Sequence, residues 1–244
     1  MGVLQDILKT KKAEIEKLTP KGKRNKPIFR LNDFFKENQI NIIAEIKASS
    51  PSAGKIRKID LDQILKTYSK YAKAISVLTD KTFFGGSFEL LRDVADATKL
   101  PVLCKDFIID KKQIDAAYIN GADLVLLIVR VLDDEKLEEL YSYAHKLGLD
   151  CLIEVHKEEE LDRIKDLKPK IVGVNSRDLD NLKIDLSRTK KILSQIEFDA
   201  IRIAESGIKN KKDIDFLKQY CDGFLIGETL LKTQDINKAF EELL

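Results

Sequence analysis

The feature that most constrains the fold of this chain is an alternation of short apolar runs with amphipathic stretches, repeated eight times from residue 42 onward. Most apolar runs are rich in β-branched residues at successive positions, as expected of parallel strands buried on both faces. The predicted strands are IIAEI (42–46), AISVL (74–78), PVLCK (101–105), DLVLLIV (123–129), CLIEV (151–155), KIVGV (170–174), IRIAE (201–205) and GFLIG (223–227).

The stretches between these runs have the period of a helix. Residues 133–148 begin with acidic side chains, which suit a helix N-terminus, and end at Gly148, while residues 110–123 contain a similar stop at Gly121. Regular strand–helix alternation predicts parallel βαβ units with right-handed crossovers. Eight such units in a chain of 244 residues favour a single α/β (β/α)8 TIM barrel over an open doubly wound sheet. No nucleotide-binding glycine motif follows any predicted strand.

The first 41 residues lie outside the eight units. Residues 3–18 are predicted to form an amphipathic helix and residues 30–38 a second short helix, with a basic loop at 19–27 between them. We expect residues 1–41 to be a helical extension that caps the barrel and residues 42–244 to be the barrel, as one domain overall. In the simpler interpretation the basic side chains of the loop (Lys21, Lys23, Arg24 and Lys26) are solvated. In the alternative they cover the active-site mouth and attract anionic substrates.

Composition excludes several classes of partner. Forty-three basic residues against 41 acidic residues give no reason to expect nucleic-acid binding. No apolar stretch is long enough to span a bilayer, and the N-terminal residues lack the features of a signal or transit peptide. Cys104, Cys151 and Cys221 have no paired spacing and are predicted to be small buried hydrophobes. We therefore expect a cytoplasmic protein whose partner is a small phosphorylated molecule, with no membrane or nucleic acid involved. A monomer is favoured over an oligomer, although the sequence does not give the oligomeric state.

Charged and polar residues cluster at the predicted carboxyl ends of the strands, where barrels of this class carry their active sites. They are Glu45 and Lys47, Lys105, Glu154, Asn175 and Arg177, Glu205, and Glu228. Any one of them could be half of a structural ion pair, but burying a charge is costly and six strands do so at the same end. No cluster of histidines or carboxylates suggests a metal, and His156 has no second ligand in register. The set predicts acid–base chemistry on an anionic substrate without metal or cofactor.

The ends of the last two predicted strands favour phosphate binding. Barrels often bind phosphate in the loops after the seventh and eighth strands. Gly207 and Gly227 allow close backbone approach there, and Ser206 adds a hydroxyl. Each glycine alone would be an ordinary turn residue, so the prediction depends on their occurring as a pair in these two loops.

At these positions the sequence resembles the indole-3-glycerol-phosphate synthase family, and the resemblance covers essentially the whole chain. The segments that carry it include IIAEIKASSPSAG (42–54), LTDKTFFGGSFELL (78–91), PVLCKDFIID (101–110), GVNSRDL (173–179), IAESGI (203–208) and FLIGETLL (224–231). The first of these is the most specific. The resemblance implies the substrate 1-(2-carboxyphenylamino)-1-deoxyribulose 5-phosphate, which is closed to a ring, decarboxylated and dehydrated to indole-3-glycerol phosphate in tryptophan biosynthesis.

The resemblance also implies roles for individual residues. Lys105 is expected to be the general acid that protonates the ribulose carbonyl, and Lys47 to hold the anthranilate carboxylate. Glu45 and Glu154 are expected to serve the proton transfers around dehydration, although the division of these steps among Glu154, Glu45 and Lys47 stays open. Asn175, Arg177 and Glu205 would position the substrate and tune the lysines. The sequence leaves the sign of the Lys105 pKa shift open, because cations and burial lower it and carboxylates raise it.

The resemblance further assigns two groups of binding residues. Those expected to receive the phosphate are Ser50, Ser206, Gly207, Gly227 and the backbone of Glu228. Those expected to enclose the aromatic ring are Phe84, Phe107 and Leu126. Four positions depart from the family pattern, namely Asp80, Gly85, Ser176 and Glu228. None removes a proposed catalytic group, and Glu228, where some members carry serine, implies a phosphate contact through the backbone N–H.

Three rival functions remain on the same fold. A Schiff-base aldolase could use Lys105 as its nucleophile, although it has no evident need for Lys47, Arg177 and an aromatic pocket. Phosphoribosylanthranilate isomerase would be expected to use a cysteine on the first strand, and Cys104 lies on the third. A barrel retained only for binding would be expected to lose its acid–base residues first, and Lys105, Glu154 and Lys47 are all present.

Overall fold

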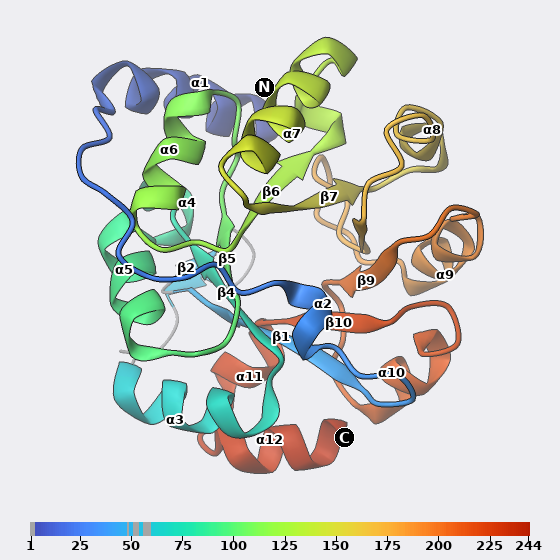
Figure 1. The fold of residues 1–244 in the computed structure, drawn as a ribbon. Coiled ribbons are helices and arrows are strands. Elements are labelled where there is room, and N and C mark those ends of the chain that lie inside the picture. The colour runs from blue at the N-terminus through green and yellow to red at the C-terminus, as the bar shows by residue number, and fades with distance from the viewer. Residues whose placement is uncertain (1–2, 48, 51–53, 56–59) are drawn as a thin grey trace.

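Eight parallel strands close into a barrel in the computed structural model, which describes residues 3–47, 49–50, 54–55 and 60–244 (Figure 1). Around the barrel the order follows the chain, and the last strand pairs with the first. The strands are β1 (Asn41–Ile46), β4 (Ala74–Leu78), β5 (Val102–Lys105), β6 (Leu124–Ile128), β7 (Asp150–Val155), β8 (Ile171–Asn175), β9 (Ile201–Glu205) and β10 (Gly223–Ile226). The predicted (β/α)8 barrel is confirmed, and every predicted strand is found.

The two faces of each strand have different neighbours. Alternate residues point inward and outward, so Ile43 packs in the barrel interior while Ile42 and Ala44 pack against the surrounding helices. The interior cluster also contains Leu103, Leu152, Ile171, Ile203 and Leu225. Two positions farther along their strands stand Glu45, Lys105, Glu154 and Glu205, so these charged residues follow the apolar interior layer at the carboxyl end.

Helices cover the outside of the barrel (Figure 1). They are α3 (Leu61–Tyr71), α4 (Lys81–Phe84), α5 (Phe88–Ala97), α6 (Lys111–Ile119), α7 (Asp134–Lys146), α8 (Glu158–Asp162), α9 (Leu186–Ser194), α10 (Lys211–Leu217), α11 (Glu228–Lys232) and α12 (Ile236–Leu243). Short polar side chains cap many of them; Asp133, for example, accepts a hydrogen bond from the backbone of Lys136. Gly121 and Gly148 follow α6 and α7 with φ of +89° and +81°. None of the helices in the described ranges is long and apolar enough to cross a bilayer.

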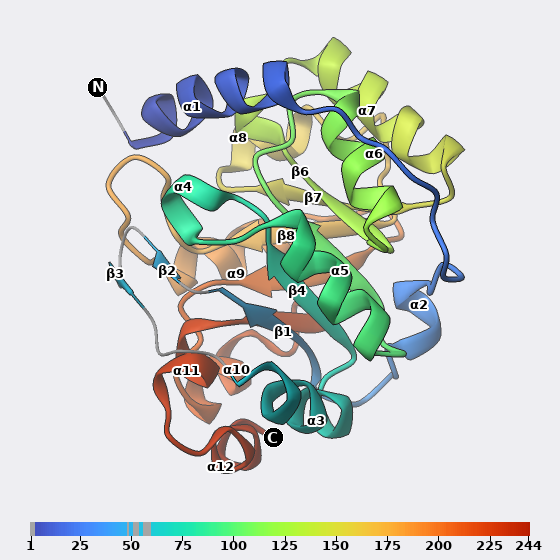
Figure 2. The same ribbon diagram turned by 90° about the vertical axis from the view of Figure 1, so that its left-hand side faces the viewer.

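The first two helices lie at opposite ends of the barrel (Figure 2). Helix α1 (Val3–Lys17) crosses the carboxyl end of the strands, where Ile7 joins the interior cluster. Helix α2 (Leu31–Phe34) lies at the other end, where Leu31 is fully buried in the same cluster. It is shorter than the predicted 30–38, because the chain turns after Phe34 and the backbone of Lys36 exchanges hydrogen bonds of 3.0 Å with the side chain of Asn41.

A buried lysine anchors α1 to the barrel. The Nζ atom of Lys11 lies 2.8 Å from Oδ2 of Asp80 and 2.8 Å from Oδ1 of Asp106, and also pairs with Glu14. Burial tends to lower the pKa of Lys11, but these carboxylates outweigh it and raise the pKa above its ordinary value. The ammonium is therefore a fixed charge between α1 and the loops that follow β4 and β5.

Two of the four basic residues in the loop after α1, Arg24 and Lys26, differ from both interpretations given above. Nη2 of Arg24 lies 2.5 Å from Oδ1 of Asp123, and Nζ of Lys26 lies 3.2 Å from Oδ2 of the same side chain. Asp123 directly precedes β6, so this contact is at the end of the barrel opposite the active-site mouth. The prediction that Arg24 and Lys26 are solvated is wrong, and so is their placement over the mouth; Lys21 and Lys23 are exposed.

Candidate active site

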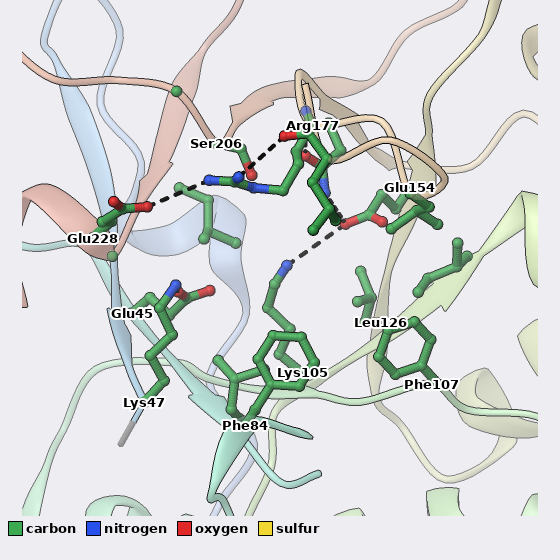
Figure 3. A pocket seen from close by; sticks show the side chains of 18 of the residues that line it. Glu45, Lys47, Phe84, Lys105, Phe107, Leu126, Glu154, Arg177, Ser206 and Glu228 are labelled. Atoms are coloured by element: carbon green, nitrogen blue, oxygen red, sulfur yellow. Dashed lines mark hydrogen bonds and ion pairs between the residues drawn. The ribbon is translucent and has the colours of Figure 1, made fainter. Parts of the chain in front are cut away.

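A pocket opens at the carboxyl ends of the strands and collects most of the predicted site residues (Figure 3). Those that line it are Glu45, Lys47, Phe84, Lys105, Phe107, Leu126, Glu154, Asn175, Arg177, Ser206, Gly207, Gly227 and Glu228. Glu205 does not line the pocket, because it is fully buried beneath it against Lys105. Ser50 belongs to the two-stranded antiparallel sheet of β2 (Ser49–Ser50) and β3 (Gly54–Lys55), and its side chain lies outside the described residues.

Lys105 is the central charge of the pocket. Its Nζ atom lies 3.2 Å from Oε2 of Glu205 and 3.6 Å from Oε2 of Glu154. Burial tends to lower the pKa of Lys105, but Glu205, Glu154 and Glu45 outweigh burial and raise it. The direction of the Lys105 pKa shift, which the sequence leaves open, is therefore upward. The side chain is an ammonium with a proton available to donate.

Glu154 presents one of its carboxylate oxygens to the pocket. Oε2 accepts a hydrogen bond of 3.2 Å from Nδ2 of Asn175. The same oxygen faces Lys105, as Figure 3 shows. Burial favours the neutral acid, but Lys105 and His156 outweigh it and hold the pKa of Glu154 below its ordinary value. Glu154 is thus an ionised carboxylate and can accept a proton.

Glu205 differs from Glu154 because its pKa is raised. Burial raises the pKa of Glu205, and the negative charge of Glu154 raises it further. The positive charge of Lys105 opposes both effects, and the resulting pKa is about 8. The protonated form donates a hydrogen bond to Glu154. A neutral Glu205 beside an ionised Glu154 avoids placing two buried negative charges side by side.

Glu45 and Lys47 form an ion pair on the wall of the pocket. Burial tends to raise the pKa of Glu45, but Lys47 and Lys105 outweigh it and lower the pKa. A Cβ on Gly227 would lie 2.2 Å from Oε1 of Glu45, so glycine at this position leaves room for the carboxylate. Lys47 is the more exposed partner, and its ammonium can exchange Glu45 for an incoming anion.

Arg177 lies along the edge of the pocket opposite the aromatic rings (Figure 3). Its Nη2 atom lies 3.3 Å from Oε2 of Glu228, and its backbone N–H donates to Oδ1 of Asn175 at 3.0 Å. The pKa of Glu228 is lowered most by its hydrogen bond from Lys232, and the positive charge of Arg177 lowers it further. Glu228 therefore directs its carboxylate toward these cations.

The loop after β9 has a left-handed backbone at two successive residues. Ser206 has φ of +63° and Gly207 has φ of +79°. The conformation is unfavourable for serine, and strain of this kind occurs often in ligand-binding loops. A Cβ on Gly207 would also lie 2.5 Å from the side chain of Ile184, so the loop packs closely against the segment after β8.

An aromatic wall borders the pocket on the side of β4 and β5. The ring centroids of Phe84 and Phe107 lie 6.2 Å apart at an interplanar angle of 36°, and Leu126 is buried nearby. Asp80 caps α4, because its Oδ1 atom accepts hydrogen bonds from the backbone of Phe83 and Phe84. Asp80 thereby fixes the position of the Phe84 ring.

Several apolar lining residues were not predicted as part of the site. They are Val3, Leu4 and Ile7 of α1, Leu78, Ile128, Leu179, Leu182, Ile208, Leu225 and Ile226. One sequence signal points to the contribution of α1: Lys11 stands four residues after Ile7, and hence on the apolar face of that helix. A lysine on an apolar face requires a buried counter-charge, which is here supplied by the barrel.

The fold has known counterparts. A solved structure of 3-hexulose-6-phosphate synthase superposes with a TM-score of 0.66 at 17% sequence identity, covering 84% of this chain and 98% of that one. At this level of identity the likeness concerns the barrel fold alone.

Comparison at the sequence level is more specific. The family model described as indole-3-glycerol phosphate synthase matches residues 3–243. Proteins of that description from Leptospira interrogans and Bacillus mycoides are 41% and 42% identical, covering 99% of this chain and 96% and 98% of theirs. A relative from Staphylococcus saprophyticus is 46% identical, covering 82% of this chain and 78% of its own length. The resemblance found in the sequence is confirmed, and the chain belongs to the indole-3-glycerol phosphate synthase family.

Proposed function

We propose that the pocket converts 1-(2-carboxyphenylamino)-1-deoxyribulose 5-phosphate to indole-3-glycerol phosphate, carbon dioxide and water by acid–base catalysis. As a member of its family, the chain is a carboxy-lyase of tryptophan biosynthesis that acts on a phosphorylated small molecule. One observation supports the residue assignments. The ammonium of Lys105 and the ionised carboxylate of Glu154 lie close together in a pocket that also has an aromatic wall.

Ring closure is the first step. The ring carbon that bears the carboxylate attacks the ketone carbon of the ribulose chain, and the carbonyl oxygen takes a proton as the new carbon–carbon bond forms. Lys105 supplies that proton and stabilises the developing alkoxide. Loss of carbon dioxide then returns the bonding electrons to the ring and restores its aromaticity.

Dehydration completes the reaction. A hydroxyl leaves with a proton as water, and a second proton leaves the neighbouring carbon to form the double bond of the indole. Glu154 and Glu45 serve these proton transfers, since both are ionised and face the pocket. Lys47 holds the anthranilate carboxylate, while Asn175, Arg177 and Glu205 position the substrate and tune the lysines.

Binding divides between two sides of the pocket. Phe84, Phe107 and Leu126 enclose the aromatic ring, and their apolar surfaces support that assignment. The phosphate is received by the loops after β9 and β10, through Ser206, Gly207, Gly227 and the backbone of Glu228, together with Ser50. The two glycines and the left-handed Ser206 support a close backbone approach at this side.

The test is direct. The purified chain is incubated with the carboxyphenylamino-deoxyribulose phosphate, and indole fluorescence and carbon dioxide release are followed together. We expect both signals in equal amounts, and folded protein that gives neither would contradict the proposal. Borohydride added with a ketose phosphate separates the aldolase alternative, because a Schiff base would label Lys105 covalently.

We also propose that the chain acts as a monomer in the cytoplasm. The proposed acid, Lys105, and the proposed base, Glu154, line the same pocket, so the chemistry proposed above needs no group from a second subunit. Light scattering across the concentration range used in the assay tests the oligomeric state: one mass with constant specific activity is expected. A dimer whose dissociation abolishes activity would contradict it.

A further inference from the structure

His156 is a fully buried side chain that the proposed reaction does not use. It directly follows β7, two positions after Glu154, and it does not line the pocket. The chain contains only two histidines, and the other, His145, is exposed on α7. The surroundings of His156 therefore need an explanation of their own.

The two ring nitrogens of His156 face two different carboxylates. Nε2 lies 3.3 Å from Oε1 of Glu154, and Nδ1 lies 3.7 Å from Oε2 of Glu160 on α8. Neither nitrogen makes an aligned hydrogen bond to any described residue, so both contacts are electrostatic. The backbone N–H of His156 donates to the same oxygen of Glu160 at 2.6 Å, which fixes the residue between the two acids.

A ring nitrogen of His156 can serve either carboxylate only as a donor. A carboxylate oxygen accepts a proton, and an imidazole nitrogen that carries a proton is a donor. Of the two acids that face the ring, Glu154 belongs to the proposed machinery and Glu160 lies outside it.

The two oxygens of Glu154 then have separate environments. Oε2 faces Lys105 on β5 and Asn175 on β8, toward the pocket, whereas Oε1 faces His156 away from it. Beyond them the protonated carboxyl group of Glu205 on β9 donates a hydrogen bond to Glu154 and keeps its proton. His156 is the one of these neighbours that does not itself border the substrate or Lys105, so it can act on Glu154 without taking part in the chemistry.

We propose that His156 is a positioning residue for Glu154, holding Oε1 from behind so that Oε2 stays turned toward the substrate and the carboxylate stays ionised. This inference rests on the proposed role of Glu154 as a proton acceptor. Its physical basis is the 3.3 Å contact between Nε2 and Oε1 at a buried position, where a ring N–H beside the carboxylate favours the ionised form of Glu154. Glu160 supports the ring from the other side.

The kinetic test compares two substitutions. His156→Leu removes the donor and retains apolar volume, whereas His156→Gln retains an N–H donor close to the position of Nε2. Loss of the donor raises the pKa of Glu154, so the acidic limb of the kcat profile should move up by about one pH unit in His156→Leu. KM should change less than kcat, and His156→Gln should restore most of the profile. His145→Leu is the matched control and should leave the profile unchanged.

A spectroscopic test needs no activity and no stable His156 variant. In His145→Leu the only imidazole signals belong to His156, and adding Glu154→Gln should shift its nitrogen resonances. Unchanged resonances would overturn the inference, as would an unmoved profile in His156→Leu or equal losses in the Leu and Gln variants. Glu154→Gln also separates failure of this inference from failure of the proposed function. Full activity in that variant would contradict the proposed role of Glu154 in the reaction, but it would not contradict the contact between His156 and Glu154.

Discussion

Gly173 on β8 faces Glu205 on β9, and a Cβ on Gly173 would lie 2.0 Å from Oε1 of Glu205. The glycine leaves the space that the buried carboxyl group occupies beneath Lys105. We predict that Gly173→Ala displaces Glu205 and, through it, Lys105, with a fall in kcat on the order of 10²-fold. Gly223→Ala is the matched control, because its Cβ would meet the ring of Phe35 at the other end of the barrel. It should lower stability and leave kcat nearly unchanged; equal kcat losses would argue against the displacement.

Lys105→Ala should remove the proton donor for ring closure. The expected fall in kcat is about 10³-fold or more, since general acid catalysis contributes on that scale. Glu205 is already protonated, so the remaining carboxyl groups tolerate the loss of the ammonium and circular dichroism should show a folded barrel. Lys111→Ala, which removes a partly exposed lysine paired with Glu139 outside the pocket, serves as the control. Near-normal turnover in Lys105→Ala would exclude the proposed first step.

Glu205 makes stability depend on pH. Its pKa is about 8 in the folded chain and near 4.5 when unfolded, so the folded state holds a proton that the unfolded state releases between these values. The contribution of this proton to the free energy of unfolding is present in full below the unfolded pKa. It is lost as pH rises through the folded pKa, by at most about 1.4 kcal/mol per pH unit.

Glu205→Gln abolishes this dependence. The free energy of unfolding of the variant relative to the parent chain should increase from pH 5 to pH 8, as measured by urea titration at each pH. Glu242→Gln, at an exposed position, should show no such trend. A difference that stays constant with pH would contradict the raised pKa of Glu205.

Lys11→Met should weaken both the fold and substrate binding. Asp80 and Asp106 would lose their shared counter-charge, and breaking a buried pair of this kind costs about 3–5 kcal/mol. Because α1 lines the pocket and Asp80 positions Phe84, KM should rise more than kcat falls. Lys12→Met, at the exposed neighbouring position, is the control for both measurements. An unchanged melting temperature and KM would show that α1 docks without Lys11.

The sequence predicted the barrel and its strands because each depends on local pattern. Burial on both faces appears as an apolar run, and the position of Glu45, Lys105 or Glu154 at the end of such a run places it at the carboxyl edge of the barrel. The pocket residues could be grouped in advance for this reason, although their individual roles remain proposals.

Contacts between distant segments could not be predicted in the same way. Arg24 and Lys26 belong to a loop whose composition suggests solvent exposure, and only the folded chain brings them to Asp123. Glu205 resembles the other strand-end acids in sequence, yet its pKa moves in the opposite direction from that of Glu154 because its carboxyl group is enclosed beneath Lys105.

Pairing between β1 and β10 has a consequence for synthesis of the chain. Asn41 of the first strand lies in register with Gly223 of the last, so β1 keeps an open edge throughout translation until β10 has left the ribosome. Glu45 and Gly227, which line the pocket from the ends of these two strands, come together only when β10 pairs with β1. A nascent chain that stalls before β10 therefore exposes two unpaired strand edges and lacks Gly227 beside Glu45, so the addition of β10 both removes the open edges and completes the pocket.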